Sequence, residues 1–532
     1  GRPAAHLAAF GTRSAAMLGL ASTLFVSGLV TAPSPRVIMK FGGSSVRDAE
    51  RIQEVCKLVV NQMEEEGVRP HLVCSAMGKT TNNLLAAAER AINEQVVDLS
   101  AVRDLHADTA VKLGLVASSE YADVLRLLDE CERTLEGVSL LGELSTRTRD
   151  RVVSYGERCS GRMVAACLND LGVPARQIES WDLGLTTCST FGDASVLDSC
   201  WPDIEVNVAA IPAEPWTVGV ITGFIGKDAS GSITTLGRGG SDLTASLVGA
   251  AAGFDEVQVW KDVDGILSAD PRVCANALPV PRVSYDEAAE LAYFGAQVLH
   301  PVAMQPAVRA RMPVRVKNSY NPSAEGTLIT ADWTQKGLVS AITSKSNICV
   351  IDITSTRMLG SYGFLAEVFD SFKRNKLSVD VVATSEVSVS LTLNKNIEIL
   401  SKVQAGPSNK EWAKEVVDES LRGVIEDLSE VSDIEAKGGR AIVTLIANVK
   451  QSSNVMAVVF QVMSALNVQV EMLSQGASKV NISLVVPGER EKEVIQALHA
   501  CFFEDACLVP MVDFAAAEVE TEVVKLGNYG KL

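Results

Sequence analysis

Short apolar runs alternate with amphipathic stretches in the part of the chain that follows residue 35. Residues 37–39, 71–75, 218–225 and 256–260 form nearly continuous apolar runs, which predict strands. Between the first two runs, apolar side chains recur at helical spacing, at Val46, Ile52, Val55, Leu58 and Val59. Apolar strands that alternate with helices are typical of a mainly parallel sheet covered by helices on both faces. We therefore expect a three-layer α/β domain that binds ligands at the carboxyl ends of its strands.

A second pattern begins after residues 318–326, which are rich in turn-forming residues and predict a domain edge. A unit of one helix and two strands then occurs twice, with strands expected at 377–382 and 387–393 and again at 468–473 and 480–486. Equivalent positions in the two copies are Phe369 and Phe460, Val379 and Val470, and Asp380 and Glu471. The repeat predicts two small α+β domains of the ferredoxin-like type.

A chain of 532 residues is too long for one hydrophobic core, so we divide it into segments. They are a leader (1–35), the α/β domain (36–330), the first small domain with a linker (340–430), the second small domain (437–515) and a tail (516–532). We expect the polar tract 404–410 and an acidic helix that ends near Asp433 to join the two small domains.

The leader contains no acidic residue and is rich in Ala, Ser and Gly. These features are typical of an organelle targeting segment that is removed after import. The uncharged stretch between Arg13 and Arg36 is also long enough for a membrane anchor, and a disordered extension is the third alternative. We expect a targeting segment, and a mature form outside the membrane.

The excess of acidic residues limits which classes of molecule the protein can bind over its surface. The formal net charge is -17, from 48 basic and 65 acidic residues. Such a chain repels phosphate backbones and anionic lipid, so we exclude nucleic acid as the main partner. The eleven cysteines and five histidines are scattered, without C-x-x-C pairs. We therefore expect buried reduced thiols in place of a disulfide framework, and no metal site built from protein side chains.

Two glycine loops each join a strand to a helix. In the first, Lys40 and Phe41 precede Gly42, Gly43, Ser44 and Ser45. Glycines let backbone N–H groups approach an anion, and a helix N-terminus favours negative charge. The second loop, 237–242, ends at Asp242, where a dinucleotide fingerprint would require glycine, so we reject a Rossmann site. Each loop taken alone is also compatible with a plain turn, but two in one α/β domain favour a nucleotide site.

Three further segments carry candidate substrate contacts. Gly78, Lys79 and Thr80 resemble the end of a P-loop, but Val73 stands where its first glycine is required. Ser75 and Thr80 then belong either to a substrate-facing loop or to a simple helix cap. Residues 260–267 and 270–272 suit nucleotide contacts, or a solvated turn. Glu157 suits a substrate ammonium group, or is an ordinary surface carboxylate.

Together these motifs resemble the aspartate kinases of the amino acid kinase superfamily. The resemblance covers about residues 36–515 and rests on 40–46, 156–157, 237–242, 260–264, 270–272 and 294–301. Residues 363–369 and 379–389 are similar to lysine-regulated ACT domains of the monofunctional type. The resemblance implies transfer of the ATP γ-phosphoryl group to the side-chain carboxylate of L-aspartate. The product, 4-phospho-L-aspartate, leads to lysine, threonine, methionine and isoleucine.

The resemblance also implies roles for single residues. Lys40 would be the catalytic lysine, oriented by Asp242, with Gly42, Gly43 and Ser44 around the phosphates. The implied aspartate contacts are Arg238, which would grip the α-carboxylate, with Ser241, Ser75, Thr80 and Glu157. The implied nucleotide contacts are Lys261, Asp262 and Arg272, and Mg²⁺ would arrive with ATP. Gln297 stands where some members of the family have a lysine that contacts the nucleotide.

For regulation, the resemblance implies a lysine site in the first repeat. Its residues would be Met358, Ser361, Val379, Asp380, Ser385 and Glu386. The second repeat has Gly476 and Ala477 in place of the last two, so we expect it to bind no effector. ACT domains of two chains would pair, which predicts a homodimer or a higher oligomer. The pathway and the leader together predict import into a plastid.

Other functions are disfavoured by particular features. Kinases of the superfamily that act on glutamate, acetylglutamate or uridylate would not predict the paired C-terminal repeat. A catalytically silent amino-acid sensor is disfavoured because Lys40, Arg238 and Asp242 are all present. We also expect no fused homoserine dehydrogenase, for which the length leaves no room.

Overall fold

The computed structural model describes residues 34–504, apart from 296–298, 336, 356–362, 386, 394–402, 407–415, 417 and 476–478. The predicted leader therefore lies almost entirely outside the described residues, and the tail lies wholly outside them. The same holds for Gln297, Met358, Ser361, Glu386, Gly476 and Ala477.

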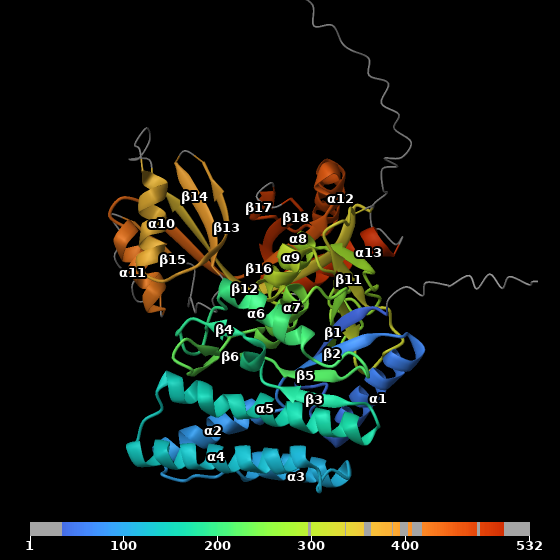
Figure 1. Cartoon of the computed structure of the whole chain (residues 1–532). Coiled ribbons are helices and arrows are strands. Elements are labelled where there is room, and N and C mark those ends of the chain that lie inside the picture. The colour runs from blue at the N-terminus through green and yellow to red at the C-terminus, as the bar shows by residue number, and fades with distance from the viewer. Residues whose placement is uncertain are drawn as a thin grey trace, which may run out of the picture. The chain divides into compact units, whose positions relative to one another are not determined.

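An eight-stranded sheet forms the centre of the N-terminal domain (Figure 1), in the order β3-β5-β2-β1-β8-β10-β11-β9. The strands are β1 (Arg36–Phe41), β2 (Arg69–Cys74), β3 (Ala175–Ile178), β5 (Val218–Thr222), β8 (Glu256–Lys261), β9 (Arg282–Ser284), β10 (Val314–Asn318) and β11 (Thr327–Thr330). All neighbouring strands pair in parallel except β10 and β11. The predicted mainly parallel sheet is confirmed.

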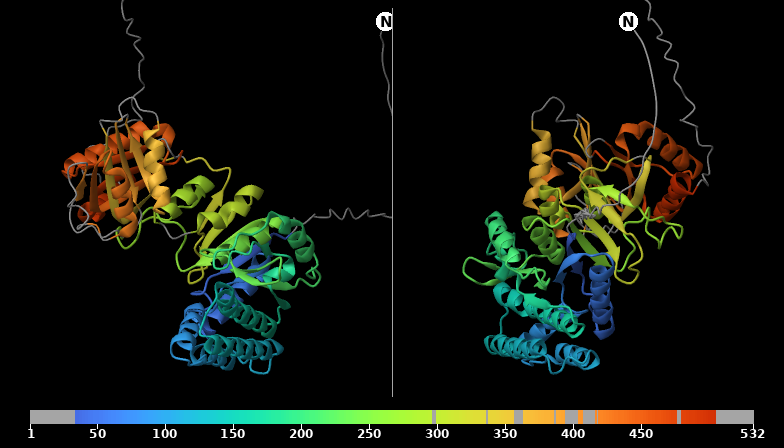
Figure 2. Two further views of the ribbon diagram at one scale, coloured as in Figure 1. Left: turned by 90° about the vertical axis from the view of Figure 1, so that its left-hand side faces the viewer. Right: turned by 45° about the vertical axis from the view of Figure 1, so that its right-hand side comes forward.

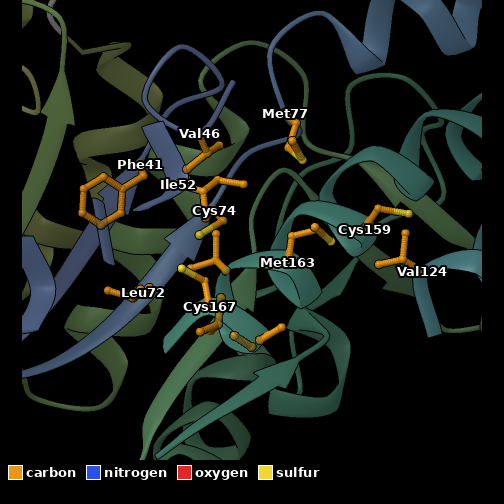
Figure 3. Packing of buried hydrophobic residues seen from close by; sticks show 14 of the residues in the cluster. Phe41, Val46, Ile52, Leu72, Cys74, Met77, Val124, Cys159, Met163 and Cys167 are labelled. Carbon is orange, nitrogen blue, oxygen red and sulfur yellow. The ribbon is translucent and has the colours of Figure 1, made fainter. Parts of the chain in front are cut away.

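Helices cover this sheet on both faces. The helices are α1 (Ala49–Glu65), α2 (Thr80–Asn93), α3 (Ser100–Lys112), α4 (Ser119–Leu141), α5 (Thr146–Asp170), α6 (Trp201–Ala209), α7 (Gly240–Ala251), α8 (Tyr285–Tyr293) and α9 (Pro301–Ala310). One core holds side chains of α1 to α5, among them Ile52, Val124 and Met163 (Figure 3). The other core holds side chains of α6 to α9. The side chains of β1 are divided between the two cores, which explains its continuous apolar run.

Two sequence predictions in this domain are wrong in detail. The apolar run 218–225 is not one strand, because β5 ends at Thr222 and Phe224 has a left-handed backbone with φ of 69°. The chain then enters a separate three-stranded sheet of β4 (Thr186–Thr187), β6 (Ile225–Asp228) and β7 (Ile233–Thr235). Residues 318–326 are not a domain edge but the connection between β10 and β11, so the large sheet continues beyond them.

The two C-terminal repeats share one antiparallel sheet. Its long strands β12 (Val339–Thr354) and β16 (Asp433–Ala447) pair along their length and run through both repeats. The first repeat adds α10 (Phe364–Arg374), β13 (Val379–Thr384) and β14 (Ser388–Leu393), and the second adds α12 (Ser452–Ala465), β17 (Met472–Gln475), β18 (Asn481–Pro487) and α13 (Glu491–Phe503). Each repeat has its own core, and Figure 2 shows the orange and red strands of the repeats beside their helices. The predicted duplicated α+β unit is confirmed.

The segment expected to link the two repeats belongs to the first repeat instead. β15 (Val403–Ala405) pairs with β16, and α11 (Glu419–Leu428) buries its apolar face in the first core. The acidic residues of α11 lie on its other face. α11 is thus part of the folded first repeat and not a linker, because its apolar face contributes side chains to the core.

Nine of the described cysteines are free thiols, eight of them buried. Cys501 is disulfide-bonded, so the prediction of reduced thiols is wrong at this position. Among the described residues, no helix is long and apolar enough to cross a membrane. The same residues contain no group of three or more His, Cys, Asp or Glu side chains placed to hold a metal ion.

Candidate active site

The carboxyl ends of four neighbouring parallel strands converge at one edge of the large sheet. Lys40 lies near the end of β1, Ser75 follows β2, Gly223 follows β5 and Lys261 ends β8. β1 pairs with β2 on one side and with β8 on the other, so the order of the strands changes direction here. Such a point leaves a crevice between the loops, and ligands of open α/β sheets bind there.

Lys40 and Asp242 form a buried ion pair at this edge. The Lys40 Nζ lies 2.7 Å from an Asp242 carboxylate oxygen, and each side chain is only 9% exposed. Asp242 lies in the first turn of α7, which begins after Gly239 in a left-handed conformation with φ of 73°. A Cβ at Gly239 would lie 2.7 Å from the His300 Cβ, so this turn requires glycine. The structure thus brings together the lysine and the acid of the two glycine loops.

A cavity of about 380 Å³ opens beside this ion pair. Its lining comprises Lys40, Ser75, Thr81, Glu157, Phe224, Gly237, Gly239, Gly240, Ser241 and Asp242. The Ser75 hydroxyl donates a hydrogen bond to the Ser241 Oγ at 2.9 Å, which links the loop after β2 to the start of α7. The sequence predicted five of these side chains, at Lys40, Ser75, Glu157, Ser241 and Asp242.

Glu157 is a buried carboxylate with unused hydrogen-bonding capacity. It lies on α5, is 3% exposed, and its Oε1 accepts a hydrogen bond from the Ala76 backbone N–H at 3.3 Å. Its Oε2 has no hydrogen-bond partner among the described residues. Burial raises the pKa of Glu157 to about 8, because removal from water disfavours the charged form. A cationic group entering the cavity would supply the missing partner.

The first glycine loop packs too closely for a side chain at Gly43. A Cβ at Gly43 would lie 2.8 Å from the Ala76 carbonyl oxygen, and the Gly78 N–H donates to the Gly43 oxygen at 3.0 Å. The loop is also anchored to the segment after β10, because the Tyr320 hydroxyl donates to the Ser44 oxygen at 3.2 Å. No local pattern in the sequence marks this anchor, since its two sides lie far apart in the chain.

The predicted nucleotide contacts do not line this cavity. Lys261 nevertheless interacts electrostatically with two residues of the cavity. Burial lowers the pKa of Lys261, the Asp242 charge raises it, and the Lys40 charge lowers it. Asp262 is exposed. Arg272 is also exposed, and its guanidinium forms hydrogen bonds with both carboxylate oxygens of Asp270.

Several other predicted residues have different surroundings from those expected. Thr80 is fully buried, and its neighbour Thr81 faces the cavity instead. Arg238 is exposed between Gly237 and Gly239, which line the cavity on either side of it. Phe224 lines the cavity but carries no polar group that would have marked it in the sequence. Its position directly after an apolar strand and Gly223 is the only signal that the sequence offers.

Part of the predicted effector site is described. The Asp380 side chain is 2% exposed, and its carboxylate accepts hydrogen bonds from the Tyr293 hydroxyl at 2.7 Å and from the Lys345 Nζ at 3.0 Å. Val379 begins β13, and the Ser385 Oγ lies 2.7 Å from the Ser388 Oγ. Asp380 thus already binds an ammonium group of its own chain, together with a tyrosine of α8.

Known protein families match both the N-terminal domain and the second C-terminal repeat. The amino acid kinase family matches residues 35–318, and an ACT domain family matches residues 443–502. A relative named "Aspartokinase 1, chloroplastic" from Arabidopsis thaliana is 46% identical over 480 residues, which cover 88% of this chain and 81% of the relative. The chain belongs to the aspartokinase family.

A bacterial aspartokinase is similar over the same span. "Lysine-sensitive aspartokinase 3" of Escherichia coli is 35% identical over 480 residues, covering 88% of this chain and 99% of the relative. The solved structure of E. coli aspartokinase III in complex with aspartate and ADP matches with a TM-score of 0.70 and 33% identity. It covers 88% of this chain and 99% of that chain. A second structure of aspartokinase III, in complex with lysine and aspartate, has a TM-score of 0.69.

Proposed function

We propose that this aspartokinase transfers the γ-phosphoryl group of ATP to the side-chain carboxylate of L-aspartate, which yields 4-phospho-L-aspartate. The observation that carries the proposal is the buried ion pair of Lys40 and Asp242 at the start of α7, beside two glycine loops. The aspartate and ADP in the aspartokinase III structure support the choice of substrates.

The acceptor needs no general base, because a carboxyl group with a pKa of about 4 is ionised at neutral pH. The obstacle is repulsion between the acceptor and the triphosphate, so catalysis reduces to positioning and charge neutralisation. A cation about 4 Å from an anion contributes roughly 4 kcal/mol at an effective dielectric constant of about 20. Lys40 supplies that charge, while Asp242 orients its amine and the glycine loops present backbone N–H groups.

The cavity suits the polar groups of aspartate. Glu157 has the free oxygen needed to bind the substrate ammonium group. Arg238 is exposed in the loop between Gly237 and Gly239 and would bind the α-carboxylate. The paired hydroxyl groups of Ser75 and Ser241 provide further donors. Thr81 lines the cavity at the position next to the predicted Thr80.

The loops after β1 and β8 would bind the nucleotide. Lys261 is electrostatically coupled to Lys40, which supports a joint role on the phosphates, with Asp262 and Arg272 farther along the chain. Mg²⁺ would arrive bound to the phosphates of ATP, since protein sites commonly hold this ion through only one or two carboxylates together with substrate phosphates. That ion would neutralise phosphate charge, and exposed Asp262 is the carboxylate available to its water shell.

We propose feedback inhibition by lysine, bound at the first ACT repeat. The aspartokinase III structure with lysine supports this, as does the buried carboxylate of Asp380. We also propose a homodimer or a larger assembly formed through the ACT repeats, because α10 leaves Leu365 42% and Phe369 39% exposed. The chloroplastic relatives support import into a plastid.

A hydroxamate assay with ATP and aspartate, with and without lysine, tests the activity and its regulation together. Lys40→Ala should lower kcat by about 10²-fold or more, as for removal of one group that stabilises a transition state. Thermal unfolding checks that the variant is folded, since it leaves Asp242 without its partner. A folded variant with near-normal turnover would contradict the role of Lys40, and a wild-type chain without product would support a silent sensor.

A further inference from the structure

A second cavity lies between α5 and the hairpin of β6 and β7. Its volume is about 620 Å³, and it shares no lining residue with the catalytic cavity. Arg147, Arg151 and Arg158 line it from one face of α5, on which they are spaced at whole helical turns. Lys227 at β6 and Trp181 line the opposite wall.

The lining of this cavity is strongly cationic in a chain whose net charge is -17. Four cations line it, and Glu130 is the one carboxylate. A neighbouring cavity of about 290 Å³ shows the contrast, because its four arginines are accompanied by three carboxylates. The neighbouring cavity is therefore nearly balanced in charge, whereas the cavity beside Trp181 has an excess of cations.

The pairing of these cations leaves two of them without a carboxylate. Arg151 binds Glu130 at 2.7 Å. Arg158 binds Glu179 at 3.3 Å, and Arg162 shares the same oxygen at 3.0 Å. Within the described ranges, Arg147 and Lys227 form no ion pair with a carboxylate. The Lys227 Nζ instead lies 4.3 Å from the centroid of the Trp181 ring.

Cations held around one cavity repel one another unless an anion enters between them. The first turn of α5 lies in the same wall, where Ser145 and Thr148 also line the cavity and the positive end of the helix dipole favours negative charge. The volume is in the range of small-molecule sites. We propose that this cavity is a binding site for a small polyanion that carries two or more phosphate or carboxylate groups.

The two elements that form the walls of this site, α5 and the hairpin of β6 and β7, also connect to the catalytic cavity. Arg158 directly follows Glu157 in α5. Asp150, also on α5, accepts hydrogen bonds from the backbone N–H groups of Gly192 and Thr235, both at 2.9 Å. Thr235 ends β7, just before the loop that leads to Asp242. A polyanion that draws the two walls together therefore acts on elements that carry catalytic side chains.

Calorimetric titration of the full chain tests the proposal, with inorganic pyrophosphate and citrate as probes in the absence of Mg²⁺. The test variant is Arg147→Gln combined with Lys227→Gln, and the matched control is Lys112→Gln combined with Arg69→Gln, two cations outside the cavity. We expect saturable binding by at least one probe, weakened at least about tenfold in the test variant and unchanged in the control. Comparison of the probes distinguishes a phosphate ligand from a polycarboxylate ligand.

Pyrophosphate can also enter the catalytic cavity, and the variants separate the two sites. If the second cavity binds, the test variant loses one equivalent of tight pyrophosphate while its KM for ATP stays within about twofold. The proposal is overturned if neither probe binds. It is also overturned if the test variant binds both probes as tightly as the wild type, because binding would then lie in the catalytic cavity alone.

Discussion

At the scale of single residues, Glu157 has the clearest dependence on pH. Its pKa is raised to about 8 by burial, so before substrate binds at pH 7 most molecules carry this carboxyl group protonated. A substrate ammonium group favours the ionised form, and binding must therefore release a proton. We expect KM for aspartate to fall as pH rises from 6.5 to 8.5, with the proton release measured by calorimetry in buffers of different ionisation enthalpy.

The Glu157→Gln variant provides the corresponding mutational test. It should raise KM for aspartate by about tenfold or more, since a hydrogen bond to a charged group is lost, and should abolish the proton release. Glu94→Gln, at an exposed carboxylate, is the control and should leave both quantities unchanged. Proton release that persists in Glu157→Gln would assign the titration to another group.

At the scale of elements, the close approach of Gly223 to α7 controls the geometry of the site. A Cβ at this position would lie 2.7 Å from the Oγ and Cβ of Ser241 and 3.0 Å from its Cα. Gly223→Ala must therefore displace the start of α7, at a cost of about 1–3 kcal/mol in unfolding free energy. Because Asp242 follows Ser241, we expect kcat/KM for aspartate to fall at least about tenfold in steady-state assays.

Gly137 offers a matched control for this substitution. It lies within α4, and a Cβ there would meet nothing within 4 Å. Gly137→Ala should leave the kinetics unchanged and stabilise the chain by about 0.5–1 kcal/mol, because alanine favours the helix. Wild-type kinetics in Gly223→Ala would show that the contact with Ser241 does not position the catalytic groups.

At the scale of the whole molecule, contacts between the N-terminal domain and the ACT repeats bear on regulation. Phe294, at the end of α8, is buried with Val381 and Met472 of the repeats. The adjacent Tyr293 donates its hydroxyl to Asp380. Lysine that binds the Asp380 carboxylate would have to compete with the Tyr293 hydroxyl and with the Lys345 ammonium group.

Tyr293→Phe should therefore make inhibition by lysine more sensitive. The loss of one hydrogen bond to a carboxylate should lower the half-inhibitory lysine concentration about fivefold, with little change in activity when lysine is absent. Tyr121→Phe, in α4, is the control. An unchanged or higher half-inhibitory concentration would show that this contact does not oppose lysine binding, without bearing on the kinase activity.

The sequence alone was sufficient to predict the alternation of strands and helices, the duplicated unit and the loops that carry Lys40 and Asp242. These features are local, because periodicity and glycine spacing depend on neighbouring residues. The burial of single side chains and the contacts between distant elements depended on the tertiary structure. Packing of distant elements decided that α11 joins the first core, that Thr81 faces the cavity in place of Thr80, and that Glu157 is buried with one oxygen unpaired. Those outcomes depend on contacts between segments that are distant in the chain, and the local pattern of residues does not specify such contacts.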